Sequence, residues 1–293
     1  MKYNNLNNKV SRVVVLGGKG FVGSEIILKL KQNNIPVISI SRKEIDLVDN
    51  SSTEYLAEKL NKNDILVIAS AIAPVKNNTM LTKNIIMVEN ICNALSLQKV
   101  KKILYVSSDA VYADKINPLN EDSLTNPVSL HGMMHLTREM MLKELNTITL
   151  AIVRPTLIYG KNDPHNGYGP NSFNRLTKEY KSIKLFGRGE EKRDHVFIED
   201  VAELSCSIIL GEFQGILNIA TGNTFSFKEV AEKIKHMYEK DLEIEYLERK
   251  GSMPHDGLRS FDSKKTTKFF PEFKYTSLDE GLNYFKNKNK TKT

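Results

Sequence analysis

The stretch VVVLGGKGFVG, residues 13–23, decides the fold class of this 293-residue chain. Its first four residues are apolar and branched, which is typical of a strand buried on both faces. The glycines at 17, 20 and 23 follow with the spacing G-x-x-G-x-x-G. Gly17 allows a tight turn out of the strand, Gly20 lets a pyrophosphate approach the backbone, and Gly23 lets the next helix pack closely. The stretch therefore predicts a strand, turn and helix that bind a dinucleotide at the helix N-terminus.

Outward from this unit, buried apolar runs and periodic helical segments alternate. The predicted strands cover 13–16, 37–40, 65–69, 102–107 and 149–153, and the predicted helices cover 22–31, 51–60, 82–97 and 129–145. Strands that alternate with helices at this spacing indicate a parallel sheet with helices on both faces. The predicted fold class is α/β, a Rossmann-type doubly wound sheet that binds ligands at the carboxyl ends of its strands.

The pattern changes after Pro155. Residues 160–172 are rich in turn formers and predict a loop. Shorter elements follow: helices over 171–181, 201–210 and 227–238, and strands over 183–186 and 217–220. We therefore expect a dinucleotide-binding domain over 1–160 with returning segments near 190–220, a smaller mixed substrate domain over 161–285, and a basic frayed tail over 286–293.

The composition argues against membrane and secreted classes. Hydrophobic residues make up 40% of the chain and charged residues 26%, and no apolar run approaches the ~18 residues of a membrane span. The polar N-terminal segment lacks the apolar stretch of a signal peptide. Cys92 and Cys206 form neither a disulfide framework nor a zinc cluster, so we expect a cytoplasmic protein.

The charge balance favours a small anionic ligand. The chain has 42 basic and 35 acidic residues, a net charge of +7, and four of its lysines lie in the tail KNKNKTKT, residues 286–293. Tryptophan is absent and no basic helix carries interleaved aromatic residues, so we expect no nucleic-acid partner. The remaining surplus of positive charge suits an anionic small molecule such as a phosphate ester.

The end of the second strand bears on the choice between NAD and NADP. An acidic residue there holds the adenosine ribose of NAD, whereas a basic residue accommodates the extra phosphate of NADP. Ser41 is not acidic and Arg42 is basic, which favours NADP. Glu44 and Asp46 follow closely and leave NAD open.

Further segments, taken in order, resemble the extended short-chain dehydrogenases, the sugar-nucleotide epimerases, dehydratases and reductases. After the glycine loop they are ASA (69–71), SSDAVY (107–112), RPTLIYG (154–160), RDHVFIEDVA (193–202), LNIA (217–220) and DSKK (262–265). The resemblance covers residues 11–285. It implies an NAD- or NADP-dependent enzyme of surface polysaccharide synthesis that acts on a nucleotide-diphosphate sugar, and a homo-oligomer, usually a dimer built through a helix bundle.

The resemblance also implies, position by position, a set of cofactor contacts. They are Gly17, Gly20, Phe21, Val22, Gly23, Ser41, Arg42, Asp46, Leu47, Ala69, Ser70, Ala71, Ser107, His135, Pro155 and Leu157. In the reductase branch that makes rhamnose and fucose nucleotides, the residue that matches Asp46 lies beside the adenine.

The chain departs from the family at the catalytic residues. Family members use a serine or threonine, a tyrosine, and a lysine four residues after the tyrosine. Ser108 matches the first of these. Alignment of NPVSLHGMMHL, residues 126–136, on the family pattern puts His131 at the tyrosine and His135 at the lysine. The i, i+4 spacing places both histidines on one helix face.

Three interpretations of the two histidines follow. In the one we expect, His131 exchanges the proton, because imidazole titrates near pH 6.5, and a cationic His135 keeps a donor near the cofactor ribose. In the second, catalysis is lost and the protein is a regulator that binds cofactor and sugar nucleotide. In the third, the pair ligates a metal, although Gly132 stands where a zinc protease has glutamate and no third ligand is evident.

Asp109 informs the reaction type. It matches the acid that protonates the departing hydroxyl in the dehydratase branch, but Ala110 replaces the glutamate base next to it. Because elimination of water needs both groups, we expect a dehydrogenase, reductase or epimerase acting at C4 and not a 4,6-dehydratase. Asp109 is a candidate catalytic residue, with a cap or loop-ordering role as the alternative.

The resemblance places the substrate contacts partly in the second domain. Asn171 matches an asparagine that touches the diphosphate, and Arg193, which precedes the aspartate of the R-D motif, belongs to the same expected set. Arg259, or alternatively Arg188, could reach a phosphate with its guanidinium group. Ser108 and Asp109 complete this set. We expect Asp194 to order its loop and not to touch the substrate.

Overall fold

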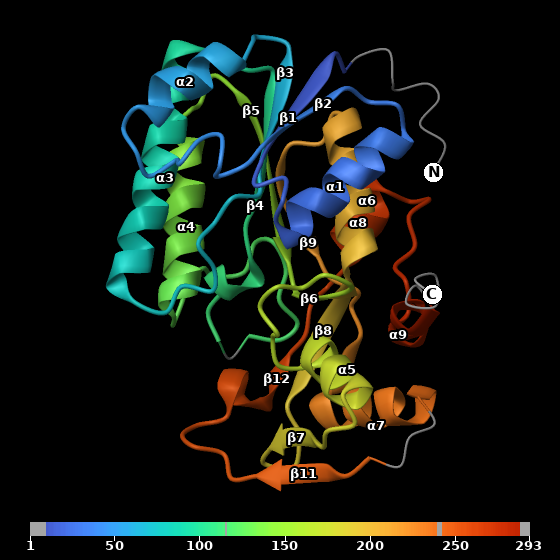
Figure 1. Ribbon diagram of the computed structural model, residues 1–293. Coiled ribbons are helices and arrows are strands. Elements are labelled where there is room, and N and C mark those ends of the chain that lie inside the picture. Colours follow the sequence, from blue (N-terminus) through green and yellow to red (C-terminus); the bar gives the residue numbers. More distant parts are fainter. Residues whose placement is uncertain (1–9, 115, 239–241, 288–293) are drawn as a thin grey trace.

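The computed structural model describes residues 10–114, 116–238 and 242–287. Figure 1 shows a parallel sheet with helices on both faces, above a smaller mixed part built from later segments. The six strands lie in the order β2-β1-β3-β4-β5-β9, and every neighbouring pair is parallel. The strand order reverses at β1, so the carboxyl end of β1 opens onto a crevice. The predicted Rossmann-type α/β class is confirmed.

The elements of the sheet lie close to their predicted positions. The strands are β1 (Arg12–Leu16), β2 (Val37–Ile40), β3 (Asp64–Ile68), β4 (Lys102–Val106), β5 (Thr149–Pro155) and β9 (Gly215–Ile219). Helices α2 (Ser52–Lys59), α3 (Asn78–Leu97) and α4 (Leu130–Lys143) cover one face, and α1 (Phe21–Gln32) and α6 (Ile198–Leu210) cover the other, with α8 (Lys264–Phe269) beside them (Figure 1).

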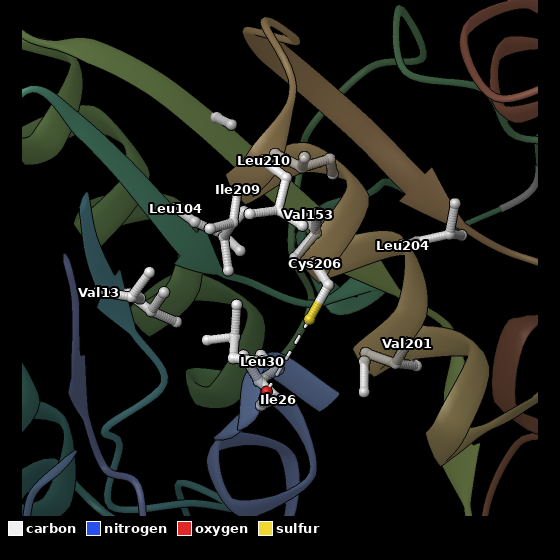
Figure 2. Packing of buried hydrophobic residues seen from close by; sticks show 14 of the residues in the cluster. Val13, Ile26, Leu30, Leu104, Val153, Val201, Leu204, Cys206, Ile209 and Leu210 are labelled. Atoms are coloured by element: carbon white, nitrogen blue, oxygen red, sulfur yellow. Dashed lines mark hydrogen bonds between the residues drawn. The ribbon is translucent and has the colours of Figure 1, made fainter. Parts of the chain in front are cut away.

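The continuous apolar run of β1 reflects burial on both faces. Val13 and Val15 pack in the cluster beneath α1 and α6, shown in Figure 2. Val14 and Leu16 pack in the opposite cluster, beneath α2, α3 and α4. Because successive side chains of a strand point to opposite faces, both sets must be apolar. Cys206 lies in the first cluster, with its Sγ 3.9 Å from the carbonyl oxygen of Ile26 (Figure 2).

The smaller part contains the predicted strand over 183–186, which is β7 (Ile183–Phe186), and five short strands that the sequence analysis did not name. These five are β6 (Leu157–Tyr159), β8 (Lys192–Phe197), β10 (Thr224–Ser226), β11 (Ile244–Leu247) and β12 (Leu258–Arg259). Strands β6, β10 and β12 pair with β8, and β7 pairs with β11. Helices α5 (Pro170–Lys178), α7 (Phe227–Tyr238) and α9 (Leu278–Asn287) pack nearby, around an apolar cluster that includes Phe173 and Phe227.

The C-terminal end differs from the prediction. Lys286 and Asn287, expected to begin a frayed tail, continue α9, and the Lys286 ammonium donates to the carbonyl oxygen of Met237 at 2.6 Å. The rest of that tail, residues 288–293, lies outside the described residues. Within the ranges given above, no helix combines the length and the apolar character that a bilayer crossing requires.

Candidate active site

Two cavities meet at the glycine loop. One of about 400 Å³ lies against the ends of β1 and β2, and one of about 700 Å³ lies between the sheet and the smaller part. Gly20, Ala69 and Ala71 line both cavities. A ligand with two halves can therefore extend from one cavity into the other across the loop.

The glycine loop has the geometry that a diphosphate needs. Gly17 has a φ of +84°, and a Cβ there would lie 2.8 Å from the backbone nitrogen of Ser70. A Cβ on Gly23 would lie 2.4 Å from the carbonyl oxygen of Gly17, so α1 packs closely against the turn. Gly20 precedes α1 without a side-chain cap, and the first turn holds no acidic residue. The helix N-terminus thus offers its N–H groups to an anion.

The smaller cavity contains the expected contacts of the adenosine half. It is lined by Gly17, Gly20, Ser41, Arg42, Asp46, Leu47, Ala69, Ser70 and Ala71, with Ile45, Val48, Ile72 and Met87 adding apolar surface. A mostly apolar lining with a few polar groups is typical of a pocket for a small molecule or cofactor.

The polar end of this cavity weakens the argument for NADP. The Ser41 hydroxyl donates to Glu44 at 2.7 Å, and Arg42 forms an ion pair with Asp46 at 3.0 Å. Partial burial opposes ionisation of Asp46, but hydrogen bonds from Val48 and Arg42 outweigh it and lower the pKa of Asp46. Arg42 therefore has an acidic partner of its own.

The larger cavity brings together expected residues from distant segments. It is lined by Phe21, Val22, Ser107, Ser108, His131, His135, Pro155, Leu157, Asn171 and Arg193. The Ser107 hydroxyl donates to Glu139 at 2.6 Å, and Glu139 is also bound by Arg154. Ser107 is thus anchored to the core by Glu139, and Ser108 lines the same cavity without such an anchor to the core among the described residues.

The start of α4 brings His131 to the cavity that Ser108 also lines. The Ser129 hydroxyl caps the helix by accepting from the Gly132 N–H at 3.1 Å. A Cβ on Gly132 would lie 2.0 Å from the carbonyl oxygen of Ala110, so glycine lets α4 approach the short turn η2 (Asp109–Val111). This close approach brings His131 and Ser108 to the same cavity.

His131 has the properties of a proton-exchanging group. It is half-buried, and its Nδ1 is buried without a hydrogen-bond partner among the described residues, so Nε2 is the nitrogen available to the cavity. Burial lowers the pKa of His131, Asp109 opposes the shift, and His165 adds to it. The imidazole is therefore neutral at pH 7, as a base requires.

His135 is uncharged, in contrast to the expected cation. Its ring is buried, and its Nδ1 lies 2.8 Å from the hydroxyl oxygen of Tyr105. Burial, followed by the neighbouring His131 and the guanidinium of Arg138, lowers the pKa of His135 well below the usual value. The expectation of a cationic His135 is wrong, because the sequence could not reveal that the ring is enclosed and that Arg138 lies beside it.

Asp109 and Arg259 bind one another and do not line the cavity. Arg259 donates from Nε to the Asp109 carboxylate at 3.0 Å and from Nη2 to the Asp109 carbonyl oxygen at 2.5 Å. Its Nη1 donates to Asp114 at 3.0 Å, and its side chain is 2% exposed. Both side chains are thus engaged with one another outside the lining of the larger cavity, and their expected substrate contacts stay predictions. The alternative, a loop-ordering Asp109, fits the structure.

The smaller part supplies polar groups to the larger cavity. Asn171 accepts from the Gly160 N–H at 3.0 Å, which holds the loop after β6. Arg193 lines the cavity and reaches Glu191 at 3.3 Å. Asp194 accepts four hydrogen bonds, from Thr156, from Gly222 and twice from Thr221, so it orders the loop as expected.

Three residues near the cavity were missed by sequence reasoning. Glu191 is buried, lines the cavity and lies between Arg193 and Arg249, whose Nη1 is 3.8 Å from its carboxylate. His165 also lines the cavity. Glu191 stands two positions before Arg193 in the sequence, and this closeness to an expected substrate contact could have identified it. Arg249 and His165 lie in irregular segments, where no periodicity marked them.

The metal interpretation of the two histidines finds no third ligand. Across the described parts of the chain, no group of three or more His, Cys, Asp or Glu side chains is arranged to hold a metal ion. Of the pair, His135 also has its Nδ1 engaged by the hydroxyl of Tyr105, at 2.8 Å.

Comparisons with known proteins agree with the geometry. The model of the NAD dependent epimerase/dehydratase family matches residues 13–220. A putative UDP-glucose 4-epimerase of Methanocaldococcus jannaschii is 29% identical over 250 residues, which cover 76% of this chain and 81% of the relative. The dTDP-4-dehydro-6-deoxyglucose reductase of Escherichia coli is 26% identical over 267 residues, which cover 79% of this chain and 83% of the relative.

Solved structures share the fold. UDP-glucose 4-epimerase of Thermotoga maritima with UDP-glucose superposes with a TM-score of 0.85 at 22% identity, covering 96% of this chain and 99% of that chain. UDP-glucose 4-epimerase of Thermus thermophilus in complex with NAD gives a TM-score of 0.85 at 21% identity, covering 96% of this chain and 100% of that chain.

Proposed function

Because the chain belongs to the NAD-dependent epimerase/dehydratase family, we propose that it transfers a hydride between a nicotinamide cofactor and C4 of a nucleotide-activated sugar. The observation that carries this proposal is that Ser108 and His131 line one cavity with Gly20 of the glycine loop. Position 4 of the sugar appears in the names of both relatives described above. The reaction is a dehydrogenation, a reduction or an epimerisation.

The proton chemistry is assigned to this chain's own side chains. When bound, the nicotinamide supplies the hydride acceptor or donor. Ser108 Oγ accepts from the Ala110 N–H at 3.1 Å. Its own O–H donates to the Asp109 carboxylate over a long distance of 3.4 Å, so this hydrogen bond is weak and the proton can turn to a sugar oxygen. His131 Nε2 takes the sugar hydroxyl proton during oxidation and returns it during reduction.

The nucleotide diphosphate is assigned to the smaller part of the molecule. Arg193 offers a guanidinium to the larger cavity, and the buried Glu191 restrains it. Asn171 lies at the start of α5 in the same cavity. We accordingly assign the cofactor to residues 1–160 with the returning segments near 190–220, and the sugar nucleotide mainly to residues 161–285.

We assign NAD as the cofactor in preference to NADP. The support is the ion pair that Arg42 forms with Asp46, which leaves a carboxylate near the adenosine end of the smaller cavity. A carboxylate there suits two ribose hydroxyls and disfavours a phosphate. The Thermus thermophilus epimerase, which shares this fold, was solved as a complex with NAD.

The wider setting is proposed from the family. A role in surface polysaccharide synthesis and a cytoplasmic location stay predictions. A dimer through α3 and α4 would cover the exposed side chains of Leu97 on α3 and Met133 and Met140 on α4. Light scattering on the purified protein measures its mass directly, and a monomer at all concentrations contradicts the dimer.

One experiment separates the enzyme from the alternative, a catalytically degenerate regulator. The purified protein is incubated with NAD or NADH and a panel of UDP-, dTDP-, GDP- and ADP-sugars. Nicotinamide absorbance reports net redox, and chromatography of the sugar nucleotides reports epimers. Turnover of one sugar nucleotide supports the enzyme, whereas binding without any turnover supports the regulator.

A further inference from the structure

The uncharged state of His135 raises the question of what its ring can donate. A neutral imidazole carries one N–H, so it donates from one nitrogen and accepts at the other. His135 stands where the family has lysine, whose ammonium donates in several directions. Its use as a donor toward the cavity therefore depends on which nitrogen carries the proton.

Tyr105, on β4, decides this tautomer. Its side chain is 1% exposed, and its hydroxyl oxygen lies 2.8 Å from Nδ1 of His135. Burial raises the pKa of Tyr105, so the phenol keeps its proton. A phenol is a stronger acid than the N–H of a neutral imidazole and is the better donor of the two. The Tyr105 hydroxyl therefore donates to Nδ1, and the ring proton of His135 resides on Nε2.

Arg138 strengthens this arrangement. It lies one helical turn after His135 on α4, its Cζ is 5.3 Å from the centre of the Tyr105 ring, and it forms no ion pair within the described ranges. A fixed positive charge beside the pair disfavours a second charge on His135 and polarises the phenol O–H toward the imidazole. The carboxylate of Glu139, the residue after Arg138, is already bound by Arg154 and Ser107.

The other ring nitrogen of His135, Nε2, is available to the cavity. His135 lines the larger cavity while its Nδ1 is directed at Tyr105, so Nε2 is the nitrogen presented to a ligand. The Ser107 hydroxyl does not compete for Nδ1, because it donates to Glu139.

We propose that Tyr105 is a positioning residue, whose hydroxyl fixes His135 as the Nε2–H tautomer and so presents an uncharged donor to an acceptor oxygen of the bound dinucleotide. The proposal rests on the proposed function only in that the dinucleotide occupies the larger cavity. It explains how a chain without the family's lysine retains a donor at that position.

Nitrogen-15 NMR of histidine-labelled protein tests the tautomer without any cofactor. The chain has six histidines, and the His135→Gln variant identifies the signal of interest by its loss. We expect the wild-type His135 proton on Nε2 and Nδ1 unprotonated and hydrogen-bonded, and loss of that hydrogen-bond signature in Tyr105→Phe. A proton on Nδ1, or a ring protonated at both nitrogens at pH 7, overturns the proposal.

The affinity for NAD, measured by calorimetry, provides the second test. We expect Tyr105→Phe to weaken binding about tenfold, the effect of one well-formed hydrogen bond, and to have no effect in a His135→Ala background. Tyr112→Phe is the matched control, since Tyr112 is equally buried and donates to Asn218 at 2.7 Å outside the cavity lining. Equal weakening in both backgrounds, or by Tyr112→Phe, overturns the proposal. Neither test involves turnover, so failure of the proposed function is a separate result.

Discussion

The rings of His131 and His135 meet edge to face, with their centres 4.8 Å apart and their planes at 89°. Two imidazolium ions at this distance would repel one another strongly in a buried site. His135 is the more enclosed and lies beside Arg138, so it stays neutral while His131 gains or loses a proton. In the proposed mechanism the two residues therefore have different roles: His131 exchanges the proton, and His135 offers a fixed donor.

The glycine loop gives a first prediction. Gly17→Ala places a Cβ 2.8 Å from the Ser70 backbone at a φ of +84°. We expect it to cost ~1–3 kcal/mol of the free energy of unfolding and to weaken NAD binding at least tenfold. Urea denaturation and calorimetry measure the two effects. Gly167→Ala is the control, because a Cβ there meets nothing within 4 Å; equal effects of the two variants contradict the account.

The cofactor preference gives a second prediction. Asp46→Ala frees Arg42 from its acidic partner. We expect wild-type protein to bind NADH more tightly than NADPH, and the variant to shift this ratio toward NADPH about tenfold, since Arg42 then pairs with the extra phosphate. Fluorescence titration with both cofactors measures the ratio. A preference of the wild-type protein for NADPH would contradict this prediction, because the Arg42–Asp46 ion pair would then have to open on cofactor binding.

The pH dependence of oxidation gives a third prediction. Burial lowers the pKa of His131 below its ordinary 6.5, and the base must be unprotonated to accept the sugar proton. We expect kcat/KM to level off on the alkaline side of pH 7 and to decline tenfold per pH unit at low pH, with the midpoint of the decline below pH 6.5. If the midpoint of the decline in kcat/KM lies at or above pH 6.5, His131 cannot be the base.

Acid stability gives a fourth prediction. Burial lowers the pKa of His195, on β8, to about 3. This histidine resists protonation only in the folded state. Its contribution to the free energy of unfolding is therefore complete above pH 6.5 and is lost as the pH falls from 6.5 toward 3. Each pH unit in that window costs ~1.4 kcal/mol. In urea titrations, His195→Leu should show a shallower fall in the free energy of unfolding than wild type; parallel curves contradict the assignment.

Much of the sheet could be predicted from the sequence, because periodicity reports burial directly. The run of β1 is apolar at every position since both faces pack, and the glycines at 17 and 23 mark close backbone approaches. By contrast, β8 begins with Lys192 and Arg193 and buries Asp194 and His195, so its polar start concealed a strand.

The candidate site could be predicted only in part. Alignment placed His131 and Ser108 at one cavity, as the structure does. It could not foresee that Arg259 binds Asp109, because these residues lie 150 positions apart and meet only in the folded chain. Nor could it foresee the neutral state of His135, which depends on enclosure and on Tyr105 and Arg138.

The most direct measurement of the central claim is the turnover of a nucleotide sugar by wild type, His131→Ala and Met133→Ala. Met133 lies on the same helix, but its side chain is 44% exposed and outside the cavity lining, so its variant is the matched control. We expect wild type and Met133→Ala to turn over one sugar nucleotide at similar rates. His131→Ala should bind NAD normally and have a kcat lower by a factor of about 10²–10⁴. Undiminished turnover by His131→Ala, or no turnover by wild type with any sugar nucleotide, would contradict the assignment of His131 as the proton-exchanging residue.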